Sequence, residues 1–359
     1  MMLNLLESLM SYDIMTRQRL IWADSLKGGL ILLVILGHAL QGTLGTDCET
    51  DHVWNIIYSF HMPAFMAVSG WLAFRGSSTC VADGYSFSLF LSVCYRRALQ
   101  LLVPFVIWTI VSYIIKGEYS IQGLFVNFLY PDRSFWFLWV LFWICVIFNL
   151  AQLVASMLKI KELVTILVTC LLLLGVMVTM EIRILGFQFI AYYYLFYTFG
   201  YCLHKYEDTV LLKVMSKPYV MVAFTILWAC LAWGWSMHGL PSWVPTIPHL
   251  PPALPQYAYR GLTGLVAIVV LIEAAPLLLN GNSKFNKMMC SLGAVSLGLY
   301  VVHLSIIGRV VDCIQSVIPS AGVWTCALLA FVIVLAISYL VVWIINTNRF
   351  TARLFLGKI

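Results

Sequence analysis

Three histidines lie deep inside long apolar runs of this sequence. They are His38 in KGGLILLVILGHA, His61 in FHMPAFMAVSGWL and His303 in LGAVSLGLYVVH. A neutral imidazole can take a proton from an attacking hydroxyl group near neutral pH. Polar groups inside an apolar span are costly and are usually retained for a function. The three histidines are therefore candidate catalytic residues, His38 first among them; the structural alternative for each is a hydrogen bond at a helix contact.

Basic residues accompany the histidines. Lys27 precedes His38 by three helical turns with only about 20° of drift, so the two share a helix face about 16 Å apart along the axis. Arg96 and Arg97 stand just before another apolar run. Ammonium and guanidinium groups bind phosphate oxygens, so the sequence predicts an anion site. Snorkelling of Lys27 and a topology-marking role for the arginines are the structural alternatives.

Metal binding competes for the same histidines. Zinc sites usually contain a closely spaced ligand pair such as HExxH, whereas these histidines fall on three separate apolar runs. The only acid well inside a run is Glu273. No GxSxG elbow or P-loop pattern is present to indicate serine or nucleotide hydrolysis. We therefore expect acid–base chemistry and no metal site.

Membrane-spanning helices must hold these residues. Hydrophobic residues make up 62% of the 359 positions and charged residues only 10%, which is typical of a polytopic membrane protein and argues against nucleic-acid binding. A bilayer core needs about 20 apolar residues. Runs of this kind are 28–44, 53–74, 99–116, 134–156, 163–180, 185–203, 218–237, 257–279, 288–310 and 323–346. We predict an all-α fold with about ten transmembrane helices, with 85–100 as an amphipathic helix at the interface that leads into the span 99–116.

The distribution of basic residues orients these spans. Most fall in loops that the ten-span count places on one side of the membrane. The five exceptions among the 21 are Lys116, Arg133, Arg183, Arg260 and Arg309. Both termini are therefore predicted to be cytoplasmic. We expect a cytoplasmic segment 1–19, one membrane domain over 20–347 and a cytoplasmic tail over 348–359, with Gly70 at a helix contact.

Five motifs, in order, resemble the integral-membrane acyltransferase 3 family, and more narrowly its fucose 4-O-acetylase-like branch. They are KGGLILLVILGHA, FHMPAFMAVSGWL, YRRALQLLVPF, SFWFLWVLF and LGAVSLGLYVVH, spread from about residue 20 to 305. The family's first-span signature, a basic residue, ten others and a histidine, maps to Lys27 and His38. Arg96 and Arg97 match its basic pair, and His303 closes its SxxxYxxH-like stretch. Lysine departs here from the commoner arginine and loses a bidentate phosphate contact.

The resemblance implies transfer of an acyl group, usually acetyl, from cytoplasmic acetyl-CoA to a hydroxyl of a cell-envelope glycan or lipid-linked sugar. We accordingly expect acyl-CoA as a donor substrate held by Lys27, Arg96 and Arg97, and no permanently bound cofactor. Expected partners are the acceptor and membrane lipids, in the inner (plasma) membrane. A transporter that uses intramembrane histidines for proton relay is the alternative. The sequence leaves the acceptor, the acyl chain and the oligomeric state open.

Overall fold

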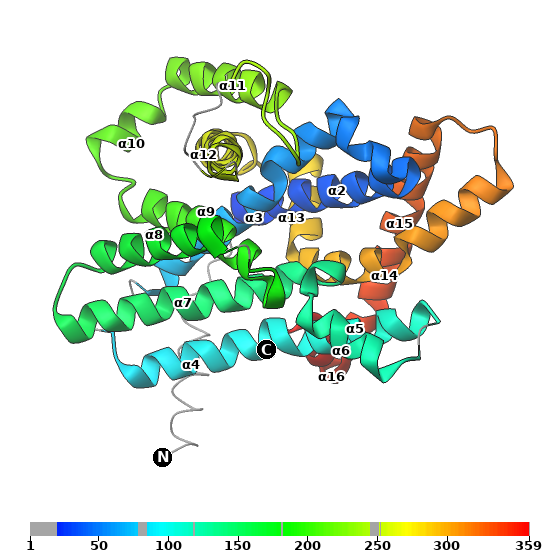
Figure 1. Cartoon of the computed structure of the whole chain (residues 1–359), viewed down its shortest axis with the longest axis horizontal. Coiled ribbons are helices and arrows are strands. Elements are labelled where there is room, and N and C mark those ends of the chain that lie inside the picture. Colours follow the sequence, from blue (N-terminus) through cyan, green and yellow to red (C-terminus); the bar gives the residue numbers. More distant parts are fainter. Residues whose placement is uncertain are drawn as a thin grey trace.

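Every regular element that the structure describes is a helix (Figure 1). The computed structural model describes residues 20–77, 85–117, 119–180, 182–244, 251 and 253–358, so the predicted segment 1–19 lies outside the described residues. The helices are α2 (Ile21–Leu44), α3 (His52–Ser77), α4 (Phe87–Arg97), α5 (Val103–Ile115), α6 (Ile121–Leu129), α7 (Trp136–Leu158), α8 (Glu162–Met180), α9 (Phe187–Lys205), α10 (Val210–Met215), α11 (Pro218–Trp233), α12 (Ala253–Leu278), α13 (Lys284–Ala294), α14 (Ser296–Val317), α15 (Val323–Asn346) and α16 (Arg349–Leu356).

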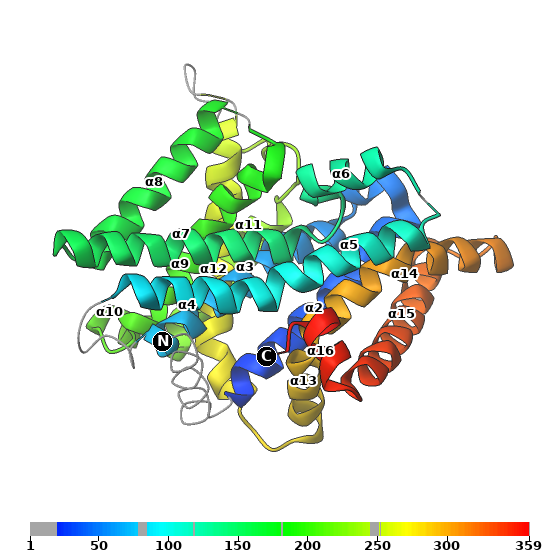
Figure 2. The ribbon, with the colours of Figure 1, turned by 90° about the horizontal axis from the view of Figure 1, so that it is seen from below.

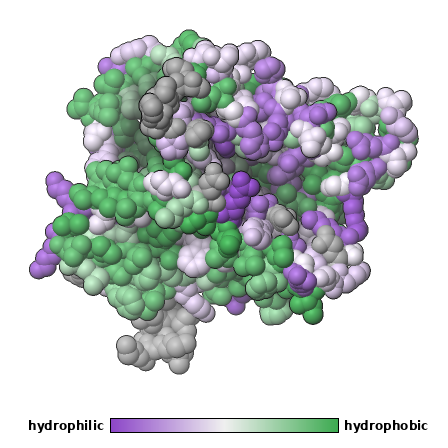
Figure 3. All heavy atoms as spheres, in the orientation of Figure 1, coloured by the Kyte–Doolittle hydropathy of each residue, from purple (hydrophilic) through white to green (hydrophobic). Residues whose placement is uncertain are grey.

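Eight helices in the described part of the chain are long and apolar enough to cross a membrane. Helices α9 and α11 match the other two predicted spans, but α9 carries five tyrosines and α11 has only 16 residues. Hydrophobic side chains gather over α4, α7 and α8 (Figure 3), as expected of a surface that faces lipid. The prediction of an all-α polytopic membrane protein is confirmed, while the count of ten spans stays a prediction.

Helices α4 and α5 form one continuous rod (Figure 2), and 87–115 as a whole is apolar enough to span a membrane. The sequence predicts an amphipathic interface helix over 85–100 that leads into the next span, and the structure joins the two directly. A π-turn over Ala98–Leu102 joins the two parts. Pro104 lacks an N–H and cannot bond the carbonyl of Gln100, which explains the wider turn at this point. Gly357, which follows α16 near the end of the chain, packs directly against the Gln100 carbonyl.

Helices α2 and α13 touch through their backbones. A Cβ added to Gly28 would collide with the carbonyl of Met289, and one added to Gly293 would collide with the carbonyl of Asp24. Ser25 Oγ also donates a hydrogen bond to a backbone carbonyl of α13, that of Asn286, at 3.3 Å. Small residues allow this close approach and the dispersion contacts that come with it. The contact fixes the end of α2 that carries Lys27.

Helices α3 and α9 cross in the same manner. A Cβ on Gly70 would collide with the carbonyl of Tyr197, and one on Gly200 would collide with the carbonyl of Ala67. The prediction that Gly70 lies at a helix contact is therefore confirmed. Because α9 lies in the interior, its tyrosine hydroxyls need partners there: that of Tyr201, for example, donates to Glu162 at 2.9 Å. This crossing fixes the position of α3.

A tight connection sets the relative depth of α2 and α3. Helix α2 ends where Gly45 adopts a φ of 61°, and after a short 3-10 segment Asp51 Oδ1 accepts a hydrogen bond from the backbone N–H of Trp54 at 2.8 Å. The left-handed glycine ends the first helix and the carboxylate caps the second. At about 1.5 Å per residue, His38 lies about 9 Å before the end of α2 and His61 about 14 Å after the start of α3, so the two reach similar depths.

Candidate active site

The structure brings His38, His61 and His303 together from α2, α3 and α14. The ring centroids of His38 and His303 are 5.4 Å apart, with 43° between the ring planes. His61 lies within electrostatic range of His38 as well. His61 and His303 are buried, with 2% and 0% of their surface exposed, whereas His38 is only half-buried. His38 is therefore the member of this histidine cluster that a substrate can reach most directly.

Backbone hydrogen bonds fix the tautomers of the two buried rings. His61 Nδ1 lies 2.6 Å from the carbonyl oxygen of Ile57, and His303 Nδ1 lies 2.9 Å from that of Leu299. A carbonyl oxygen only accepts hydrogen bonds, so each Nδ1 carries a proton and each neutral ring keeps its lone pair on Nε2. His303 Nε2 is buried and has no hydrogen-bond partner among the described residues. The cluster thus holds basic nitrogens free to accept a proton or a hydroxyl hydrogen bond.

Gln41 and Tyr58 orient His38. Gln41 stands one helical turn after His38 on α2 and interacts with its side chain, and its Oε1 accepts a hydrogen bond from Tyr58 Oη at 3.0 Å. The Tyr58 ring lies 6.3 Å from the ring of His38 and 4.8 Å from that of His61. Gly37 makes this approach feasible, because a Cβ there would lie 2.9 Å from Tyr58 Cε2. Within the described residues an amide and a phenol, rather than a carboxylate, thus contact and position His38.

Tyr300 connects the cluster to the start of α7. Its ring centroid is 5.8 Å from that of His303, one helical turn further along α14. Its hydroxyl accepts a hydrogen bond from the backbone N–H of Phe137 at 3.3 Å, and the two rings are 5.5 Å apart. Two motifs far apart in the sequence, SFWFLWVLF and LGAVSLGLYVVH, therefore meet at this point.

The three predicted donor-binding residues lie on two different helices, Lys27 on α2 and the two arginines on α4. Lys27 Nζ pairs with Asp24 Oδ1 at 2.6 Å, one turn back on α2. Arg97 donates to Gln100 Oε1 at 3.0 Å beside the π-turn, and Arg96 occupies the last turn of α4. Lys27 keeps its place on the His38 face, three turns away, while the arginines belong to the α4–α5 rod.

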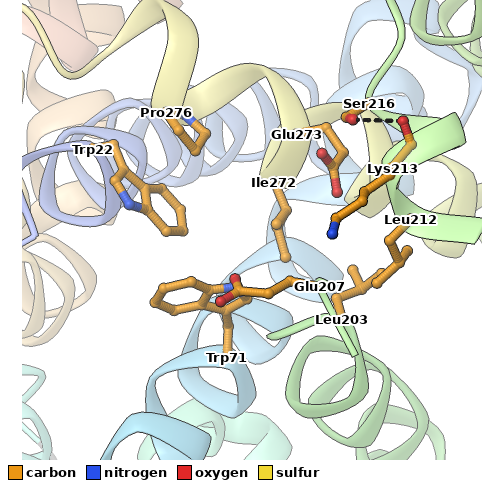
Figure 4. Close-up of a pocket in the computed structure, with 10 residues that line it drawn as sticks. All are labelled: Trp22, Trp71, Leu203, Glu207, Leu212, Lys213, Ser216, Ile272, Glu273 and Pro276. Carbon is orange, nitrogen blue, oxygen red and sulfur yellow. Dashed lines mark hydrogen bonds between the residues drawn. The ribbon is translucent and has the colours of Figure 1, made fainter. Parts of the chain in front are cut away.

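A cavity of about 270 Å³ opens at the end of the bundle where α2 begins (Figure 4). Its walls are Trp22, Trp71, Leu203, Glu207, Leu212, Lys213, Ser216, Ile272, Glu273 and Pro276. Sixteen residues at about 100° each place Trp22 roughly 160° around α2 from His38. The cavity therefore opens on the other face of α2 from the line that joins Lys27 to His38, and it contains none of the predicted site residues.

Two orienting residues escaped the sequence reasoning. Tyr58 stands three positions before His61, and Gln41 stands three positions after His38, spacings that place each on the same helix face as its histidine. The signal was therefore present, but polar residues near a span end are common and carry little information alone.

As for metals, the described residues contain no group of three or more histidine, cysteine, aspartate and glutamate side chains arranged to hold an ion.

The fold and this cluster define a polytopic membrane protein with a histidine site between its helices. The chain belongs to the acyltransferase 3 family: the family profile described as "Acyltransferase domain" matches residues 20–346. It is therefore a multi-pass membrane protein of an acyltransferase family.

Two curated relatives match part of the chain. The nodulation protein NolL of Sinorhizobium fredii is 36% identical over 130 residues, which cover 32% of this chain and 32% of the relative. NolL of Mesorhizobium japonicum is 32% identical over 136 residues, covering 35% of this chain and 34% of the relative. The similarity thus spans about a third of the length of each relative. No solved structure matches the chain.

Proposed function

We propose that this protein is an O-acetyltransferase that moves an acetyl group from acyl-CoA to a hydroxyl of a cell-envelope glycan or lipid-linked sugar in the inner membrane. Family membership supports the acyl transfer. The observation that carries the chemistry is the meeting of three histidines from three helices, with the His38 and His303 rings 5.4 Å apart. A sugar hydroxyl is a weak nucleophile unless a base takes its proton during the attack.

In this mechanism His38 acts as the base. The acceptor oxygen attacks the thioester carbonyl as His38 takes its proton, so that a C–O bond forms and the C–S bond then breaks. The departing thiolate receives the proton back from His38. Gln41 and Tyr58, which contact His38 from α2 and α3, hold the ring in the orientation that proton transfer requires.

The tautomers narrow the roles of the other two histidines. While neutral, His61 and His303 have their only N–H engaged by backbone carbonyls, so neither Nε2 can donate a hydrogen bond to an oxyanion. Each Nε2 can instead accept one from an acceptor hydroxyl. This geometry favours a role in orienting the acceptor, or as a second base, over oxyanion stabilisation.

The donor enters, in this proposal, from the end of the bundle where α2 begins, taken as cytoplasmic. Lys27 meets a phosphate of the donor, and Arg96 and Arg97 offer further cationic contacts along the α4–α5 rod. The separation of about 16 Å between Lys27 and His38 along α2 leaves room for an extended pantetheine arm. Asp24 keeps Lys27 on that face of the helix.

His38→Ala tests this function. Membranes that contain the wild type or the variant are incubated with radiolabelled acetyl-CoA, and label is measured in envelope glycan and in lipid-linked sugar. The variant should lose the label at equal protein level, whereas His52→Ala, an exposed histidine stacked on Trp233 at 4.7 Å, should keep it. Acetylation by His38→Ala at the wild-type rate would show that the mechanism is wrong. Solute uptake or efflux without acyl transfer would favour the transporter.

A further inference from the structure

Arg260 of α12 is enclosed by aromatic rings. Its guanidinium carbon lies 5.3 Å from the ring centroid of Trp235, 5.5 Å from that of Tyr192 and 5.9 Å from that of Tyr257. Tyr192 and Trp235 are buried, while Arg260 and Tyr257 are half-buried. Each ring face attracts the cation, and the attraction strengthens as water is excluded. We call these four residues the arginine cage.

Among the residues that the structure describes, the hydrogen bonds of Arg260 go only to neutral atoms. One terminal nitrogen donates to the carbonyl oxygen of Met237 and the other to its sulfur, both at 3.3 Å. Nε is buried and unpaired. Across the described ranges no carboxylate pairs with Arg260, although Lys27 has Asp24 and Lys205 has Glu162.

An arginine cannot shed its proton, so this charge lacks a counter-charge of its own. The need to anchor the segment after α11 does not explain why position 260 holds a charged residue. Gln256 Nε2 already donates to the same Met237 carbonyl at 2.9 Å, a shorter bond than the one from Arg260. A neutral side chain at position 260 would serve equally well as a second donor there. A guanidinium among aromatic rings is instead suited to an anion, because it binds carboxylate or phosphate oxygens in pairs.

Aromatic residues connect the arginine cage with the histidine cluster. The ring centroid of Tyr193 lies 5.1 Å from that of Trp136 at the start of α7. The ring of the next residue, Phe137, lies 5.5 Å from that of Tyr300, which is 5.8 Å from His303. The ring of Tyr193 is also 5.1 Å from that of its neighbour Tyr192 in the cage. The arginine cage and the histidine cluster are therefore the two ends of one series of packed aromatic rings.

We propose that the arginine cage binds an anionic group, the carboxylate or phosphate of a uronic acid or sugar phosphate, on the acceptor that the histidine cluster acylates. The inference rests on the proposed function and adds a class of acceptor to it. Arg260 supplies the charge, and the aromatic rings pack against the apolar faces of the sugar. The anion also provides the counter-charge that the chain itself does not place beside Arg260.

Binding to the purified full-length protein in detergent tests the proposal without any acyl transfer. The probes are glucuronate, glucose 1-phosphate, neutral glucose and short-chain phosphatidylglycerol, measured by calorimetric titration. We expect at least one anionic sugar to bind at least tenfold more tightly than glucose. Arg260→Gln should abolish this preference. Arg260→Lys should retain part of it, because the charge remains and the paired geometry is lost.

Arg309→Gln is the matched control, because Arg309 is an exposed arginine on α14 that bonds the backbone carbonyl of Ile115; its preference should equal that of the wild type. Gel filtration shows whether each variant is folded. If Arg260→Gln does not fold, the preference for anionic sugars is measured in Arg260→Lys instead. Equal binding of glucose and the anionic sugars, or an unchanged preference in the variant at position 260, overturns the proposal. So does Arg260-dependent binding of phosphatidylglycerol alone, which would assign the cage to a lipid. Loss of acetyl transfer in the labelling assay bears on the proposed function instead.

Discussion

His303 has a nitrogen that the fold does not use, and removing that nitrogen separates function from stability. His303→Asn retains an amide donor near the position of Nδ1, which bonds the Leu299 carbonyl at 2.9 Å, and deletes the unpaired Nε2. Asparagine brings its own acceptor, Oδ1, in place of the unpaired Nε2, so the number of unpaired buried acceptors does not change. The cavity left by a few ring atoms costs about 1 kcal/mol, so the free energy of unfolding should stay the same or fall by about 1 kcal/mol.

Activity should change far more than stability. If Nε2 accepts a hydrogen bond or proton from the acceptor hydroxyl, its loss should lower the rate of acetyl transfer by about 100-fold or more. Thermal unfolding of the purified variant gives the stability, and transfer from radiolabelled acetyl-CoA, normalised to folded protein, gives the activity.

His204→Asn provides the control. His204 Nδ1 also bonds a backbone carbonyl, that of Trp71, at 2.7 Å, and its ring stacks on the Trp71 ring at 3.5 Å. Loss of this stack should cost about 0.5–1.5 kcal/mol and leave acetyl transfer unchanged. A His303→Asn protein that is less stable than His204→Asn and fully active would mean that His303 is a packing residue, and the reasoning would fail.

Two further predictions concern the contact between α3 and α9 and the binding of the donor by Lys27. Gly70→Ala would place a Cβ 2.7 Å from the carbonyl carbon of Tyr197, so α3 and α9 must separate, and thermal unfolding should show a loss of about 1–3 kcal/mol. Gly175→Ala, with open space around its Cβ, should be neutral or stabilising; equal losses in both would contradict the crossing geometry. Lys27→Ala should raise the KM for acetyl-CoA several-fold and Lys27→Arg should not, and an unchanged KM in Lys27→Ala would remove Lys27 from the donor site.

The histidine cluster was within reach of the sequence because burial of polar groups in a bilayer is costly. His38, His61 and His303 stand out from runs of apolar residues, and the structure places all three together. Gly70 was recognised for a related reason, since small residues let helices approach closely. Features of this kind are local, so a single sequence exposes them.

Pairings between helices could not be predicted from the sequence, because they depend on residues far apart in the chain. Nothing in the runs that contain Gly28 and Gly293 shows that the two helices touch, because an apolar face fits many neighbours equally well. The α4–α5 rod was divided because Arg96 and Arg97 interrupt an apolar run, and periodicity cannot show that the helix continues through them. The arginine cage depends on rings from three separate segments and has no sequence spacing of its own.

The contact between α2 and α13 has a consequence for how the protein is made. Ser25 bonds the backbone at Asn286, which is 261 positions later in the chain. A ribosome that adds about 5–20 residues per second needs roughly 13–52 s to reach that point. Throughout this interval the first helix has its polar residues and its glycine face in the bilayer without the helix that covers them. Biogenesis of this protein therefore includes a waiting period, during which the glycine face of α2 lacks its late partner α13.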